Sequence, residues 1–196
     1  MAMENKPTYP GDYLQALDNL LSAAQLEQLT KRYPPIFLFG YLMLPAVLKS
    51  TSEAFKDLDI AKSMTQGTLI AHELYFLEGS DIPVVIPSSS DDVGVDGLLV
   101  FDLDAEQRGW LYQFESNPSI ELRHVRTQTR LADGSLRSLD AGAFIFKEDK
   151  RQALTKSTSR SWNIDSFLSS QLYRTMTRGY EASHSDSGLR SSEEPK

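Results

Sequence analysis

The chain has 196 residues and no cysteine, which allows one domain with a substantial core and excludes disulfides, thiolate zinc sites and a cysteine nucleophile. Its formal net charge of -7 argues against a nucleic-acid binder, because such proteins usually present a basic face. No apolar run reaches membrane-spanning length and the first residues lack the apolar segment of a signal peptide, so we expect a cytoplasmic protein without a membrane partner.

The N-terminal part is predicted to be helical after a loose start. Residues 1–11 are polar, contain two prolines and are expected to be flexible. A helical pattern follows, in which Asp12 with Gln15 has the spacing of a capping box and Ser22 with Gln25 has the spacing of a second. The pattern therefore leaves open whether one helix or two short helices form here. Two consecutive prolines end the helical stretch.

The middle of the chain is predicted to consist mainly of strands. Short apolar or alternating runs between turn residues indicate strands at residues 36–40, 67–79, 82–86, 93–103, 120–131 and 139–147. The sequence "DGS" at 133–135 is typical of a hairpin turn.

Three more helices are predicted between and after these strands. They comprise a short one in "LPAVLKS", one capped by Asp104 with Gln107, and a final one over residues 162–177. Residues 147–161 have the composition of a solvated loop.

This order of elements predicts an α+β fold. We expect a small mixed, largely antiparallel β-barrel with flanking helices. A single domain would span residues 12–178, with a helical extension at its N-terminus and its core in residues 36–147. Residues 179–196 carry five serines and four acids and are expected to form a disordered tail.

Two stretches could carry chemistry. In "FLFGYLMLP", Gly40 closes an apolar strand and a short helix follows, a junction that can point backbone N–H groups at a carboxylate. A tight turn is the plainer alternative there. In "WLYQFESNP", Glu115 ends a helix just after aromatic residues, so it is either solvated or aimed into a pocket. Together the two stretches would make a minimal site for a ligand bearing both an acid and an amine.

Four stretches in chain order carry a further signal: "FLFGYLMLP", "IPVVI", "VDGLLVFDLDAEQRGWLYQFES" and "NPSIELRHV". They resemble the Y-G-T-L strand-loop, the Y-P-hydrophobic strand, the passage ending L-D-x-F-E and the following Y-x-R stretch of the gamma-glutamylcyclotransferase-like proteins. That family includes the gamma-glutamylamine cyclotransferases and the avirulence-induced-gene-type proteins. The resemblance covers roughly residues 36–147, and "SWNIDSF" looks like a motif common after that domain.

The resemblance implies an enzyme, a transferase or lyase, that cyclises a gamma-glutamyl amine, peptide or conjugate to 5-oxoproline and releases the amine. Glu115 falls on the catalytic glutamate, the general acid and base, and Phe39, Gly40, Tyr41 and Leu42 fall on the substrate loop. The implied reaction needs no metal and no cofactor, and its only implied partner is the gamma-glutamyl substrate of glutathione-related metabolism. A monomer or a homodimer is expected.

The chain departs from the family pattern at several positions. Phe39 replaces the usual tyrosine and loses a hydroxyl, and Tyr41 puts a bulky ring where threonine or serine is usual. Tyr112 stands where aspartate is common and Glu121 where tyrosine is common, while Arg123 keeps the arginine. Two alternatives to an enzyme therefore stay open. One is a non-catalytic module that binds a small acid on the same fold, and the other is an interaction protein that docks through its N-terminal helices and acidic tail.

Overall fold

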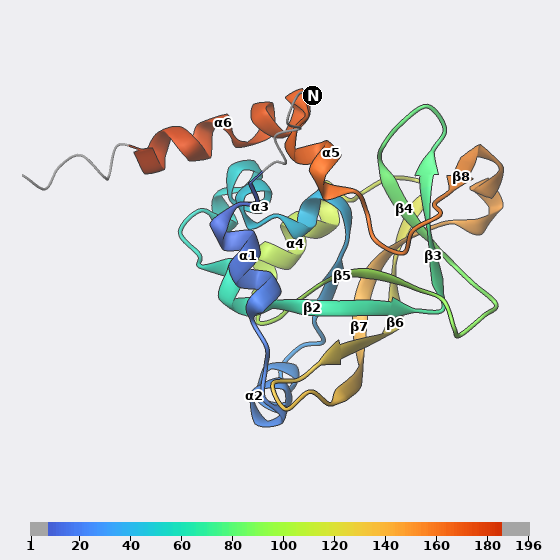
Figure 1. Ribbon diagram of the computed structural model, residues 1–196, viewed down its shortest axis with the longest axis horizontal. Helices are drawn as coiled ribbons and strands as arrows, with labels where there is room; N and C mark the ends of the chain where they lie inside the picture. Colours follow the sequence, from blue (N-terminus) through green and yellow to red (C-terminus); the bar gives the residue numbers. More distant parts are fainter. Residues whose placement is uncertain (1–7, 186–196) are drawn as a thin grey trace, which may run out of the picture.

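Five strands close into a barrel in the computed structural model, which describes residues 8–185 (Figure 1). Strand β1 pairs in parallel with β7 and antiparallel with β5, and the remaining pairs, β5 with β2, β2 with β6 and β6 with β7, are antiparallel. The predicted mixed, largely antiparallel barrel is thus confirmed. The barrel strands are β1 (Ile36–Leu38), β5 (Gly94–Val100), β2 (Met64–Ile70), β6 (Ile120–Arg130) and β7 (Leu136–Phe146).

A second sheet of three strands lies beside the barrel, in the order β4 (Pro83–Pro87), β3 (His72–Leu77) and β8 (Leu154–Lys156) (Figure 1). The single strand predicted over residues 67–79 is wrong, because Ala71 takes a positive φ of 57° and divides the run between the two sheets. The loop predicted over 147–161 is also wrong in part. It contains a 3-10 helix, η4 (Glu148–Ala153), and strand β8, which pairs with β3.

The helices gather mainly on one side of the barrel, away from the second sheet (Figure 1). They are α1 (Gly11–Asp18), α2 (Ala23–Thr30), α3 (Pro45–Thr51), α4 (Ala105–Phe114), α5 (Ile164–Leu168) and α6 (Gln171–Ser185), with 3-10 helices η1 (Gly40–Met43), η2 (Glu53–Phe55) and η3 (Ile60–Ser63). Within residues 8–185, no helix is both long and apolar enough to cross a bilayer.

The predicted helix starts are partly confirmed. The capping box at Ser22 is present at α2, whereas α1 begins at Gly11 without a side-chain cap, so the box predicted at Asp12 is wrong. The N-terminal stretch therefore forms two short helices.

The predicted final helix is two helices, because the chain turns between α5 and α6. Helix α6 continues to Ser185, beyond the predicted start of the tail at Gly179. Residues 1–7 and 186–196, where the flexible start and most of the tail were predicted, lie outside the described part of the chain.

One hydrophobic core joins the barrel to the helices. Strand β1 is buried at all three positions, and Phe37 at its centre is fully buried together with Leu98 of β5, Leu48 of α3 and Phe55 of η2. Removing a buried aromatic side chain of this kind typically costs about 3–5 kcal/mol. The core therefore fixes the end of β1, where the predicted substrate loop begins.

Candidate active site

The loop after β1 depends on a glycine for two reasons. Gly40 opens η1 with a φ of +68°, in the left-handed region that side chains other than glycine adopt at a cost. A Cβ added at Gly40 would also lie 2.5 Å from Cγ of Pro83, the first residue of β4. The loop therefore packs directly against the second sheet, and only a residue without a side chain allows this approach.

Helix α4 holds Glu115 at its C-terminal end. The predicted capping box fixes the start of this helix, with Asp104 Oδ1 accepting from Gln107 N at 2.9 Å and Gln107 Oε1 accepting from Asp104 N at 3.0 Å. The Gln107 amide also donates to the backbone oxygen of Ala54 in η2 at 3.2 Å, which anchors α4 to the neighbouring turn. Glu115 itself caps the last turn, where its N–H donates to Leu111 O.

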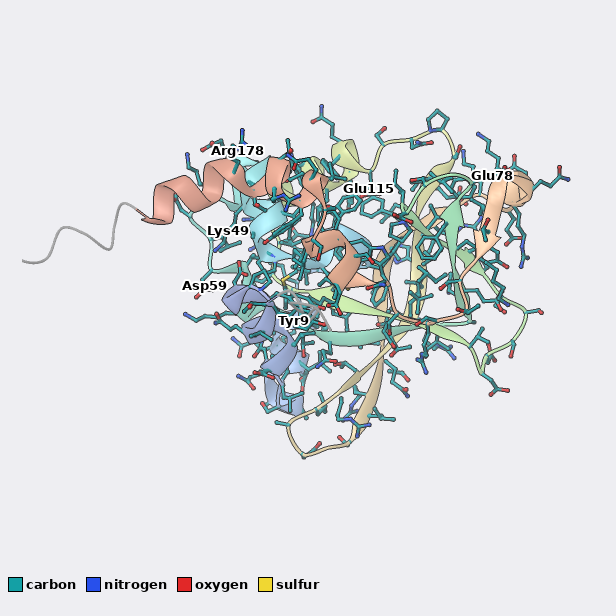
Figure 2. The ribbon with its side chains drawn as sticks, turned by 45° about the horizontal axis from the view of Figure 1, so that its top comes forward. Tyr9, Lys49, Asp59, Glu78, Glu115 and Arg178 are labelled. Carbon is teal, nitrogen blue, oxygen red and sulfur yellow. The ribbon has the colours of Figure 1, made fainter. Side chains whose placement is uncertain are left out.

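A single cavity of about 230 Å³ is lined by both predicted stretches. Phe39, Tyr41 and Leu42 line it from the loop, and Glu115 lines it from α4. In the view of Figure 2, Glu115 lies between the helical side of the molecule and the strands. Gly40 does not line the cavity, and its α-carbon instead faces Pro83 in the cavity wall.

Sequence reasoning did not identify most of the cavity walls. They come from strands β3, β4 and β7, from the turn between β3 and β4 and from the turn after α4, and they include Leu77, Ile82, Val84, Asn117, Phe144 and Phe146. The signal available for the β7 residues was the hairpin register, which sets Ile120 opposite Phe146. The closure of the barrel, which brings β7 beside β1, has no local signature in the sequence.

Burial sets the acidity of this site. It raises the pKa of Glu115 from its ordinary 4.5 to about 7, and no ion pair of Glu115 within residues 8–185 offsets the effect. Burial and the nearby charge of Glu115 also raise the pKa of Tyr41 to about 12. At neutral pH, Glu115 can therefore both take up and release a proton, and Tyr41 remains an O–H donor.

Aromatic rings pack around the helix end that carries Glu115. Phe114 contacts the Tyr41 ring edge-on at 6.3 Å between centroids and stacks on Trp110 at 4.6 Å. Trp110 in turn meets Phe55 of η2 edge-on at 5.5 Å. Tyr41 and Phe114 line the same cavity as Glu115, whose side chain is half-buried.

The other departures from the family pattern lie outside the residues that line this cavity. Tyr112 packs edge-on against Phe144 at 6.0 Å, and Glu121 forms an ion pair with Arg123 along β6. The charge of Arg123 is thus paired with that of Glu121.

In the described part of the chain, no group of three or more histidine, aspartate or glutamate side chains could hold a metal ion.

The raised pKa of Glu115 predicts a falling stability as the pH rises. The folded state binds a proton at Glu115 up to about pH 7, whereas the unfolded state releases it near pH 4.5. The free energy of unfolding should therefore drop between these values, by up to about 3 kcal/mol from this group. Urea unfolding at pH 5 and pH 8.5 measures the drop.

The Glu115→Gln variant is the control for this pH effect. Other groups also contribute to the pH dependence, such as His72, whose pKa burial lowers. The difference between wild type and variant isolates the carboxyl group from them. Equal pH slopes for the two proteins would show that Glu115 is not desolvated.

Comparisons with known proteins give the following matches. Residues 36–164 match the family model described as gamma-glutamyl cyclotransferase, AIG2-like, and no curated protein matches the chain. Two solution structures from Arabidopsis thaliana are 15% identical, cover 82% of this chain and 95% of their own, and have TM-scores of 0.48 and 0.49. A crystal structure of an AIG2-like protein from Mus musculus is 16% identical, covers 66% of this chain and 88% of its own, and has a TM-score of 0.44.

Proposed function

Because this chain belongs to the gamma-glutamyl cyclotransferase, AIG2-like family, we propose that it cyclises a gamma-glutamyl amine, peptide or conjugate to 5-oxoproline and releases the amine. Glu115 is the general acid and base of this reaction. The observation that supports the proposal most is the single cavity that both Glu115 and the loop after β1 line, together with the raised pKa of Glu115.

The reaction closes a five-membered ring. The α-amine of the glutamyl group attacks the γ-carbonyl carbon, a new N–C bond forms, and the amide bond to the leaving nitrogen breaks. The chain must fold so that the α-nitrogen and the γ-carbon meet. Holding reacting atoms in such an arrangement can contribute several kcal/mol, about 7–11 in the most favourable intramolecular cases. A small cavity with walls of aliphatic and aromatic side chains suits this folding task.

Glu115 handles the protons. The α-amine arrives protonated and cannot attack until it loses a proton, which the Glu115 carboxylate accepts. The protonated carboxyl group then donates that proton to the leaving nitrogen. The second proton that the α-nitrogen loses as the ring closes also passes to the departing amine, which leaves as an ammonium ion. A carboxyl group with a pKa near 7 is a far better base than one at 4.5, and it is still ionised in part at neutral pH.

The loop supplies hydrogen-bond donors. The first N–H groups of η1 have no partner inside that helix, so they are available to the α-carboxylate or to the oxyanion that develops on the γ-carbonyl. The Tyr41 hydroxyl is a further donor at this cavity. None of these roles requires a cofactor.

A non-catalytic module that binds a small acid is the second candidate. The observation that favours it is that both Phe39 and Tyr41, which replace a usual tyrosine and a usual threonine or serine, line the cavity. Such changes can preserve binding and still spoil the geometry of the reaction.

One experiment separates the two candidates. The protein is incubated with a panel of gamma-glutamyl amines and dipeptides, 5-oxoproline is measured by mass spectrometry, and binding is measured by calorimetry. Release of 5-oxoproline from at least one substrate is the expected result. Saturable binding without 5-oxoproline would instead establish the binding module.

A further inference from the structure

A second and larger cavity, of about 740 Å³, adjoins the one that contains Glu115. Tyr41 and Ile82 line both cavities, so the two cavities meet at these residues. A ligand that is held beside Glu115 and extends past Tyr41 and Ile82 would therefore enter the second cavity. The rest of the second cavity is formed by the β3–β4 hairpin and by helices α5 and α6.

The walls of the second cavity are largely aromatic and apolar. Trp162 and Phe167 line it and are buried, and Leu172 and Met176 add aliphatic surface from α6. The Phe167 ring lies 6.0 Å from the Tyr41 ring and 5.1 Å from the Trp162 ring. Aromatic side chains thus continue from the surroundings of Glu115, through Tyr41, into the second cavity.

The charged lining of this cavity is negative. Asp81 is the only charged residue that lines it within the described part of the chain, and no lysine, arginine or histidine does so. A ligand that carries a carboxylate would lack a cationic partner here and would meet a like charge. A neutral or cationic ligand is favoured.

Most polar side chains of the cavity serve local structure. Asn163 Oδ1 accepts from the backbone N–H of Ser166 at the start of α5, and Ser170 Oγ accepts from that of Tyr173. Ser80 Oγ accepts from Ile82 N in the β3–β4 turn. These groups leave the aromatic surface as the dominant contact for a ligand.

Part of this cavity lies outside the residues that match the family model, and one of its walls departs from the family pattern. The family match ends at Ile164, where α5 begins, so most of the α5 and α6 contribution follows it. Tyr41, which contacts α5 through Phe167, stands where the family usually has a small hydroxyl residue.

We propose that the second cavity binds the amine portion of the substrate and that this portion is an aryl-alkyl amine without a carboxylate. This specificity rests on the proposed function, because it places the scissile amide where the two cavities meet, at Tyr41 and Ile82. The glutamyl group lies beside Glu115, the amide C–N bond breaks at this junction, and the amine leaves on the α5–α6 side with the proton from Glu115.

Three substrates test this specificity: gamma-glutamyl-2-phenylethylamide, gamma-glutamylmethylamide and gamma-glutamylphenylalanine. The first and third share the ring and differ by one carboxylate, and the second lacks the ring. We expect kcat/KM for the phenylethylamide to exceed that for each of the others by about tenfold or more, the scale set by seating an aromatic group in an apolar pocket. Equal values for the three would overturn the proposal.

Two variants test whether this substrate preference arises in the second cavity. Ser166 is exposed and lines the second cavity, so Ser166→Phe fills it without removing core packing. This variant should lower kcat/KM for the phenylethylamide to the level of the methylamide. Ser169, the C-cap of the same helix, is exposed and does not line the cavity, so Ser169→Phe should behave as wild type. Equal substrate preference in both variants would contradict the proposal.

A binding measurement keeps this proposal separate from the proposed function. The chain has two tryptophans, so in the Trp110→Phe background Trp162 in the cavity wall is the sole fluorophore of its kind. Titration with free 2-phenylethylamine should give a saturable change in fluorescence that the added Ser166→Phe substitution abolishes. This result without turnover of any substrate would contradict the cyclisation and support the cavity, whereas no saturable change would overturn the cavity.

Discussion

The Glu115→Gln variant is expected to lower kcat for 5-oxoproline formation by about 10²–10⁴-fold, the usual contribution of a general acid and base. Glutamine keeps the volume and the hydrogen-bonding capacity of the side chain, so the fold should persist. It cannot accept the proton of the α-ammonium group, which then remains unable to attack. Turnover is measured by mass spectrometry of 5-oxoproline, and folding by thermal melts followed by circular dichroism.

Glu106→Gln is the matched control for this variant. Glu106 lies in the first turn of the same helix, α4, and is exposed to solvent. Its replacement should leave both turnover and stability unchanged. Wild-type turnover by the Glu115→Gln protein would remove Glu115 from the mechanism.

The Gly40→Val variant is expected to lose most activity and much stability. Valine would have to adopt a φ of +68°, and its Cβ would lie 2.5 Å from Cγ of Pro83. The left-handed backbone and the overpacking together should cost about 2–5 kcal/mol. Relief of the clash would move the loop away from β4 and would displace the N–H groups of η1 from the cavity. Urea unfolding gives the stability, and steady-state kinetics give KM and kcat.

Gly134→Val is a control that separates the effect of backbone strain from the effect of displacing the loop after β1. Gly134 has a φ of +82° in the turn between β6 and β7, and a Cβ there would meet nothing within 4 Å. This control should lose stability through its backbone but keep the wild-type KM. A wild-type KM for Gly40→Val would show that the loop takes no part in binding the substrate.

Much of the barrel could be predicted because its signals are local. The apolar run at β1, the alternation along β6 and the turn sequence around Gly134 each identify an element without reference to the rest of the chain. The capping box of Asp104 likewise gave the start of α4 and so the place of Glu115 at its end. Family resemblance then supplied the reason to join Glu115 with the loop after β1.

The parts that could not be predicted depend on long-range contacts. Nothing in the sequence marks Ala71 as a positive-φ residue; only the pairing of β2 and β3 in different sheets requires the break there. Strand β8 is three residues long, and the 2.6 Å ion pair of Lys156 with Glu73 joins it to β3. The pairing of Tyr41 with Phe167 joins two segments far apart in the chain, so the second cavity has no sequence pattern.

Glu115 and the loop after β1 are proposed to act on one ligand. The most direct test is a crystal structure of the Glu115→Gln variant with a bound gamma-glutamyl amide. We predict that the α-nitrogen of the ligand lies within hydrogen-bonding distance of the side chain at position 115. Its carboxylate or γ-carbonyl oxygen should contact the N–H groups at the start of η1. A ligand bound elsewhere, or with its α-nitrogen turned toward solvent, would contradict the account.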